Sequence, residues 1–94
     1  MNIKNVEITK KAERDLKKVP FYIVTKFQVW LDLVETEGVI EARKIKSFHD
    51  EPLVGNRKGQ RSIRLNKAYR AIYVENNRGE IELIEMQEVN KHDY

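Results

Sequence analysis

The chain has 94 residues, of which 40% are hydrophobic and 35% charged, and its formal net charge is +3. This length fits a single domain, 1–94, with a small core. Without cysteine there is no disulfide framework or thiolate zinc site, and the apolar runs are too short for a membrane span or a signal peptide. We therefore expect a cytoplasmic protein that makes no membrane contact. The two histidines have no ligand spacing that favours a metal site, so no metal or other cofactor is expected.

Two helices are predicted in the first part of the chain. Thr9 can cap a helix that runs to about Lys18, and Pro20 can open a second one, where its missing N–H costs nothing. Gly38 is a typical stop for that second helix. Its apolar face, which we expect in the core, consists of Ile23, Phe27, Trp30, Leu31 and Val34. The two helices should form a hairpin on an apolar layer, and residues 39–46 can add a short third helix.

The second half of the chain has the pattern of a small sheet. Residues 47–60 read SFHDEPLVGNRKGQ, where proline and glycine interrupt regular structure and predict a loop. The period then changes to two in the runs RSIRL, YRAIYVE and EIELIEMQEV. The short connections NKA and NNRG join these runs into an antiparallel meander. The sequence thus predicts an α+β fold, with an N-terminal helical hairpin packed on an antiparallel β-sheet.

Charge is unevenly distributed along this half. Residues 41–70 carry nine Lys or Arg against three Asp or Glu, a net charge of +6. Residues 71–90 carry one Arg against five Glu, a net charge of −4. A basic surface built from the middle of the chain is typical of proteins that bind a polyanion. The alternative is a solvated basic face that binds nothing.

Arg70 stands out within the predicted second strand of the meander. Alternation places it on the same face as Ile72 and Val74, and a guanidinium on an apolar face needs a partner. That partner is either a glutamate of the chain or a phosphate from outside. On the preceding strand Arg64 points away from Ile63 and Leu65, as expected for a solvated basic face.

Two stretches, GNRKGQRSIRLNKAYRAIY and the terminal EVNKHDY, together with the order of the elements, resemble the RelE/HigB group of bacterial toxins. The resemblance implies the RelE-like fold and the toxin role of a type II toxin–antitoxin system. It implies an mRNA endoribonuclease that acts in the ribosome without a metal, by attack of the RNA 2′-hydroxyl on the adjacent phosphate. The implied partners are the ribosome, mRNA and a cognate antitoxin, often one with a helix-turn-helix domain that reaches operator DNA.

The resemblance also assigns candidate roles to residues. Arg70 matches the family's arginine on the second meander strand, where a planar guanidinium can bind two phosphate oxygens. Lys91, His92 and Tyr94 match a C-terminal cluster, and histidine can act as acid or base near neutrality. The end of the last strand should bring this cluster towards Arg70. The predicted contacts with the RNA backbone are Arg57, Lys58, Arg61 and Arg64.

The loop departs from the family pattern. Some relatives carry a histidine two positions before the loop leucine and a lysine just before its glycine. Here EPLVG puts Glu51 and Val54 in those places, and His49 lies two positions earlier. The general base is then His49, Glu51 or His92, unless the chain is a weak nuclease.

Two other functions fit the same residues. The first is a non-catalytic ParE-type toxin that inhibits DNA gyrase, against which the terminal NKHDY argues. The second is a nucleic-acid-binding module without chemistry. Substitution of His92 separates the hypotheses, since only a nuclease should lose activity while it keeps its fold.

Overall fold

The structure, a computed structural model, describes residues 2–89. Its fold is α+β, with three α-helices, two short 3₁₀ helices and five strands. In chain order these are β1 (Val6–Ile8), α1 (Lys10–Leu16), α2 (Phe21–Glu37), α3 (Val39–Arg43), η1 (Lys46–Phe48), β2 (Glu51–Pro52), η2 (Gly55–Arg57), β3 (Gln60–Arg64), β4 (Tyr69–Glu75) and β5 (Ile81–Glu88). Among the helices of this part of the chain, none has the length and apolar character needed to cross a membrane.

The strands form one mixed sheet in the order β1-β5-β4-β3-β2. The predicted meander is confirmed, because β3, β4 and β5 pair antiparallel. The structure adds a strand at each edge: β1 runs parallel to β5, and β2 pairs antiparallel with β3. These strands have three and two residues, too few to produce an alternating pattern in the sequence.

The predicted helices begin where the sequence indicates, and α1 ends at Leu16, two residues earlier than predicted. The Thr9 hydroxyl accepts a hydrogen bond from the Ala12 N–H at 3.1 Å and caps α1. Pro20 precedes α2, and Gly38, with φ of +91°, follows it. The buried residues of α2 all belong to the predicted apolar face: Ile23, Phe27, Trp30 and Val34. The third helix ends at Arg43, three residues earlier than predicted.

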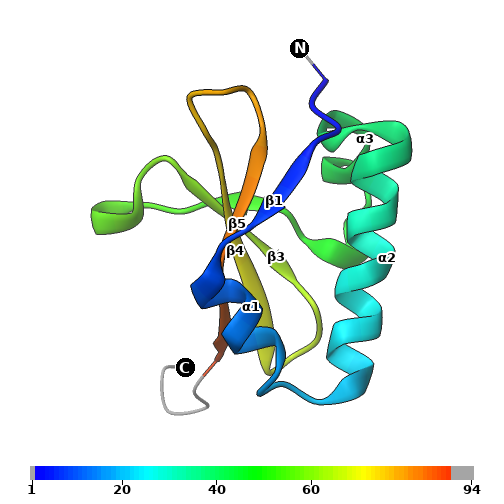
Figure 1. The fold of residues 1–94 in the computed structure, drawn as a ribbon, viewed down its shortest axis with the longest axis vertical. Helices are drawn as coiled ribbons and strands as arrows, with labels where there is room; N and C mark the ends of the chain where they lie inside the picture. Colours follow the sequence, from blue (N-terminus) through cyan, green and yellow to red (C-terminus); the bar gives the residue numbers. More distant parts are fainter. Residues whose placement is uncertain (1, 90–94) are drawn as a thin grey trace.

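The helices lie on one face of the sheet and leave the other face open. Figure 1 shows α2 along one side of the sheet, while the loop between η1 and β3 extends away from it. Ile63 and Ala71 are paired across β3 and β4, and both lie in the core shared with the helices. Arg64, Arg70 and Gln87 form a row of directly opposed residues on the opposite face, which we call the open face. Chemistry that needs access to solvent therefore has the open face available.

Candidate active site

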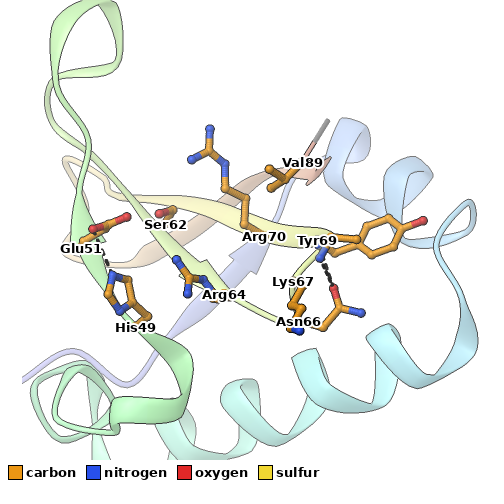
Figure 2. A pocket seen from close by; sticks show the side chains of 10 residues that line it. His49, Glu51, Ser62, Arg64, Asn66, Lys67, Tyr69, Arg70 and Val89 are labelled. Atoms are coloured by element: carbon orange, nitrogen blue, oxygen red, sulfur yellow. Dashed lines mark hydrogen bonds and ion pairs between the residues drawn. The ribbon is translucent and has the colours of Figure 1, made fainter. Parts of the chain in front are cut away.

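A pocket of about 650 Å³ lies where the open face meets the loop after η1. Figure 2 shows the side chains that surround it, with Arg70 projecting from β4 on the side away from α2. The lining consists of His49, Glu51, Ser62, Arg64, Asn66, Lys67, Ala68, Tyr69, Arg70 and Val89. Three of these residues are permanently cationic and one is a carboxylate, so the pocket suits an anion.

Arg70 is half-buried in this pocket, as the alternation of β4 predicts. Its Nε donates a hydrogen bond to Oε1 of Gln87 at 2.7 Å. Its partner is thus an amide, and within residues 2–89 Arg70 forms no ion pair. The glutamate that the sequence offered as one possible partner is not there. Among the described residues no carboxylate balances the charge of this guanidinium, and the external anion is the other partner that the sequence suggests.

Arg64 lies directly opposite Arg70 across the β3–β4 ladder. Like charges that face each other across an antiparallel pair repel and destabilise the sheet. Arg64 is exposed, as predicted, and among the described residues it too lacks an ion pair.

His49 and Glu51 both reach the pocket from the loop. Nε2 of His49 lies 3.3 Å from Oε2 of Glu51, and both side chains are about half exposed. His49 has φ of +45°, in the left-handed region that few non-glycine residues adopt. This backbone conformation places the imidazole beside the carboxylate (Figure 2). The two candidate bases of the loop are therefore brought together at one rim of the pocket.

Between them, the Asp50 side chain is completely buried. Its Oδ1 accepts a hydrogen bond from Nε of Arg61 at 2.7 Å, and its Oδ2 accepts one from the Tyr73 hydroxyl at 2.6 Å. Nε of Arg43 in turn donates to the Tyr73 hydroxyl at 3.2 Å. We call these four residues the Asp50 network. It anchors the loop to β3, β4 and α3, and none of its four residues is among those that line the pocket.

The predicted RNA contacts do not form one surface. Arg61 shares the helix side of β3 with Ile63, and its guanidinium is bound to Asp50, so it lies apart from Arg64, and its contact with RNA stays a prediction. Arg57 forms an ion pair with Glu85 at 2.8 Å and donates to Gln60 at 2.8 Å. Lys58 is exposed beside it. Strand alternation explains the separation, because Arg61 and Arg64 are an odd number of residues apart.

Three predicted site residues, Lys91, His92 and Tyr94, lie outside the described part of the chain. The last described residue, Val89, lines the pocket, and its N–H donates to the Ala68 carbonyl. Gln87 at the end of β5 pairs with Arg70 near the start of β4. The end of the last strand therefore does lie beside Arg70, as the meander predicts.

Two residues of this region are not predicted from the sequence. Gln87 binds Arg70, and Asp50 anchors the loop. The sequence does carry a weak signal for Asp50, which stands between two titratable candidates in a loop. For Gln87 there is no comparable signal, because its contact with Arg70 depends on the register of β4 and β5.

The sequence matches no family model and no curated protein. The fold, by contrast, matches several solved structures. YafQ from E. coli has a TM-score of 0.73 at 15% identity, with 90% of this chain and 92% of that chain covered. The YoeB dimer from Staphylococcus aureus has a TM-score of 0.68 at 18% identity, with 96% and 100% covered. The archaeal RelE–RelB complex from Pyrococcus horikoshii has a TM-score of 0.69 at 23% identity, with 97% and 99% covered.

These matches extend over nearly the whole chain on both sides, so they concern the complete architecture and not a shared motif. YafQ of E. coli forms a toxin–antitoxin complex with DinJ, and a YoeB/ParE protein from Agrobacterium tumefaciens is a toxin. The identity is too low for residue roles to be transferred. With its helices packed on one face of a five-stranded mixed sheet, the chain has the RelE-like fold of these structures.

Proposed function

We propose that this chain is the toxin of a type II toxin–antitoxin pair and an endoribonuclease that cuts mRNA on the ribosome. The observation that carries the proposal is the state of Arg70, a half-buried guanidinium in a 650 Å³ pocket held by a neutral amide. A partly buried charge that lacks a counterion is costly, and a phosphate would supply one. The RelE-like fold supports the toxin role.

The reaction requires a base, an acid and cations around one phosphate. The RNA 2′-oxygen attacks the adjacent phosphorus, and its proton passes to the base. The bond from phosphorus to the 5′-oxygen breaks, and that oxygen takes a proton from the acid. The products are a 2′,3′-cyclic phosphate and a free 5′-hydroxyl, and no metal is needed to balance the step.

Residues of the pocket match the base and the cations, and we assign the acid to the C-terminal residues that the sequence indicates. Arg70 and Arg64 stabilise the negative charge that builds up on the phosphate oxygens. The His49–Glu51 pair accepts the 2′-hydroxyl proton, and His92 supplies the proton to the leaving oxygen. We assign Lys91 to charge stabilisation and Tyr94 to stacking or proton transfer.

We propose two classes of partner. The first is the ribosome with its mRNA, whose backbone the exposed Lys58 and Arg64 contact. The second is a cognate antitoxin, supported by the RelE of similar fold that forms a complex with RelB. Through a DNA-binding antitoxin the toxin reaches operator DNA indirectly.

Induced expression in a bacterial host, with primer extension on cellular mRNA, tests the proposal. We expect cuts at codon-defined positions for the wild type and a loss of about 100-fold or more for Arg70→Met and His92→Ala. Arg78→Met is the matched control, because Arg78 is an exposed arginine in the turn at the other end of β4. It should cut like the wild type.

Each other outcome has a distinct meaning. Growth arrest without mRNA cuts contradicts the nuclease and indicates a ParE-type inhibitor of gyrase. Cuts that survive in His92→Ala contradict its role as the acid and move that role to Tyr94, His49 or Glu51. Thermal unfolding of each purified variant shows whether the fold is retained.

A further inference from the structure

The open face carries a continuous chain of hydrogen bonds that ends at Arg70. Arg57 binds Oε1 of Glu85 at 2.8 Å, and Nε2 of Gln87 donates to Oε2 of Glu85 at 3.0 Å. Oε1 of Gln87 then accepts from Nε of Arg70 at 2.7 Å. We call Arg57, Glu85, Gln87 and Arg70 the open-face network. All four side chains are half-buried, so these bonds are partly shielded from solvent.

The hydrogen-bonding capacity of these groups fixes which of them donates and which accepts. Arginine can only donate hydrogen bonds and an ionised carboxylate can only accept them. The residue between Arg70 and Glu85 must therefore accept on one side and donate on the other, which an amide does. A glutamate at position 87 would hold Arg70 but repel Glu85, and an apolar residue would hold neither.

The network also separates the charge of Arg70 from the charges of the Glu85–Arg57 ion pair. Burial acts to raise the pKa of Glu85, but the bonds from Gln87 and Arg57 and the charge of Arg57 hold it below its ordinary value. Glu85 is therefore ionised at neutral pH, and its charge is balanced by Arg57. Gln87 thus fixes the position of Arg70 relative to this ion pair, and because its amide is neutral it places no charge beside Arg70.

The register of β5 explains how Gln87 comes to face Arg70. Tyr73 pairs with Leu83 and Ile72 pairs with Glu85, so Ile84 is an extra residue between them, a β-bulge. If β5 lacked this extra residue, the pairing that begins at the turn between β4 and β5 would place Met86 opposite Arg70. The bulge turns Glu85 and Gln87 to the open face and Met86 to the core.

Helix α1 holds this bulge in place. The Thr9 hydroxyl lies 3.5 Å from the Ile84 carbonyl oxygen, and the Met86 N–H donates to Oδ2 of Asp15 at 3.1 Å. Backbone groups that the bulge takes out of the ladder thus find partners on α1. β-Bulges beside functional sites often change the direction of a side chain, and this one directs Gln87 towards Arg70.

We infer that Gln87 is a positioning residue for Arg70, fixed in its amide orientation by the Glu85–Arg57 pair. It holds the guanidinium by Nε alone, and within residues 2–89 no other side-chain hydrogen bond or ion pair engages Arg70, so its two terminal nitrogens can bind a phosphate in the pocket. The inference rests on the proposed function for its cleavage readout, whereas the hydrogen bond and the response to phosphate can be measured without it.

Two substitutions distinguish the effect of the position of Arg70 from the effect of its charge. Gln87→Met keeps the length of the side chain and the charge of Arg70 but removes the hydrogen bond. Gln87→Glu keeps an acceptor for Nε but places a negative charge on Arg70. Gln28→Met is the matched control, because Gln28 is an exposed amide on α2 that bonds to Asp32.

The first readout is the NMR signal of the Arg70 Nε–H, assigned by comparison with Arg70→Met and titrated with inorganic phosphate. The wild type should show a protected signal that shifts with phosphate. Gln87→Met should lose the protection, and Gln87→Glu should keep the protection but lose the response to phosphate. Gln28→Met should match the wild type in both respects.

The second readout is single-turnover cleavage on purified ribosomes programmed with a short mRNA. We expect Gln87→Met to lower the rate at saturating ribosome by about 10- to 100-fold, because small misplacements of a catalytic group have effects of that size. The ribosome concentration at half-maximal rate should change little. An unchanged Arg70 signal and cleavage rate in Gln87→Met would overturn the inference. A wild type that does not cut mRNA contradicts the proposed function, and the inference is then decided by the Arg70 signal and the phosphate titration.

Discussion

Tyr73 is the one tyrosine of the sheet that is fully buried, and its hydroxyl has two partners in the Asp50 network. Burial and the hydrogen bond to Asp50 raise its pKa to about 12, against the opposing effect of Arg43. In the unfolded chain the pKa of a tyrosine is about 10. The folded state therefore favours the neutral phenol.

This difference predicts a loss of stability in alkali. Tyr73 contributes fully below about pH 10, and its contribution disappears as the pH rises through about 12. At 1.36 kcal/mol per pKa unit, the loss is about 2–3 kcal/mol. Urea unfolding of the wild type and Tyr73→Phe across this range should show a smaller alkaline loss in the variant. Equal losses in the two proteins would contradict the prediction.

The same variant should be less stable than the wild type at neutral pH. Tyr73→Phe leaves Oδ2 of the buried Asp50 without its donor, which costs about 1–3 kcal/mol in the free energy of unfolding. Tyr22→Phe serves as the control, because the Tyr22 side chain is exposed. A Tyr73→Phe protein as stable as the control at pH 7 would show that the Asp50 network does not hold the loop.

At the scale of elements, the connection between α2 and α3 depends on Gly38. Its φ of +91° and ψ of +160° lie in a region that is essentially restricted to glycine. The Asn2 side chain occupies the space beside it, donating to the Glu37 carbonyl at 2.9 Å and accepting from the Ile40 N–H at 3.0 Å. A Cβ at position 38 would lie 2.1 Å from Oδ1 of Asn2.

Gly38→Ala should therefore destabilise the protein both by backbone strain, worth about 1–3 kcal/mol, and by displacement of Asn2. Gly55→Ala is the control for strain, since Gly55 also has positive φ but open space around it. Chemical denaturation of both variants, and of Gly38→Ala combined with Asn2→Ala, separates the two effects. If Gly38→Ala costs no more than Gly55→Ala, the Asn2 contact is not significant.

The helices and strands that the sequence predicts are those with a signal in neighbouring residues. The cap at Thr9, Pro20 before α2 and the period-two runs are properties of neighbouring residues, and they locate the helices and the meander. The edge strands β1 and β2 have no such signal, because they are defined by pairing with distant strands. The pairing of Gln87 with Arg70 depends on the bulge at Ile84. In the sequence this bulge is indicated only weakly, by the two successive apolar residues Leu83 and Ile84.

At the scale of the whole molecule, stability and the proposed chemistry occupy different faces of the sheet. The core cluster is formed on the helix face by residues from Ile3 to Met86. The pocket residues Arg64 and Arg70 stand on the open face, outside that cluster. Substitutions of these two residues should therefore change activity more than stability.

The same separation predicts the effect of removing residues 90–94. All core residues in the described part of the chain precede this segment, and β5 ends at Glu88. We expect the free energy of unfolding of the truncated chain in urea to lie within about 1 kcal/mol of that of the full chain, because the truncated chain keeps this whole cluster. It should still bind ribosomes through its basic pocket, with the usual dependence on salt.

Toxicity, by contrast, should be abolished by the truncation, because it removes Lys91, His92 and Tyr94 together. A growth assay on induced cultures, combined with ribosome co-sedimentation, measures both properties. Binding without growth arrest is the expected result, and the single variant His92→Ala should reproduce it if His92 is the acid. A truncated protein that still arrests growth would show that the pocket acts without these residues, and the acid would then have to be found among His49, Glu51 and their neighbours in the loop.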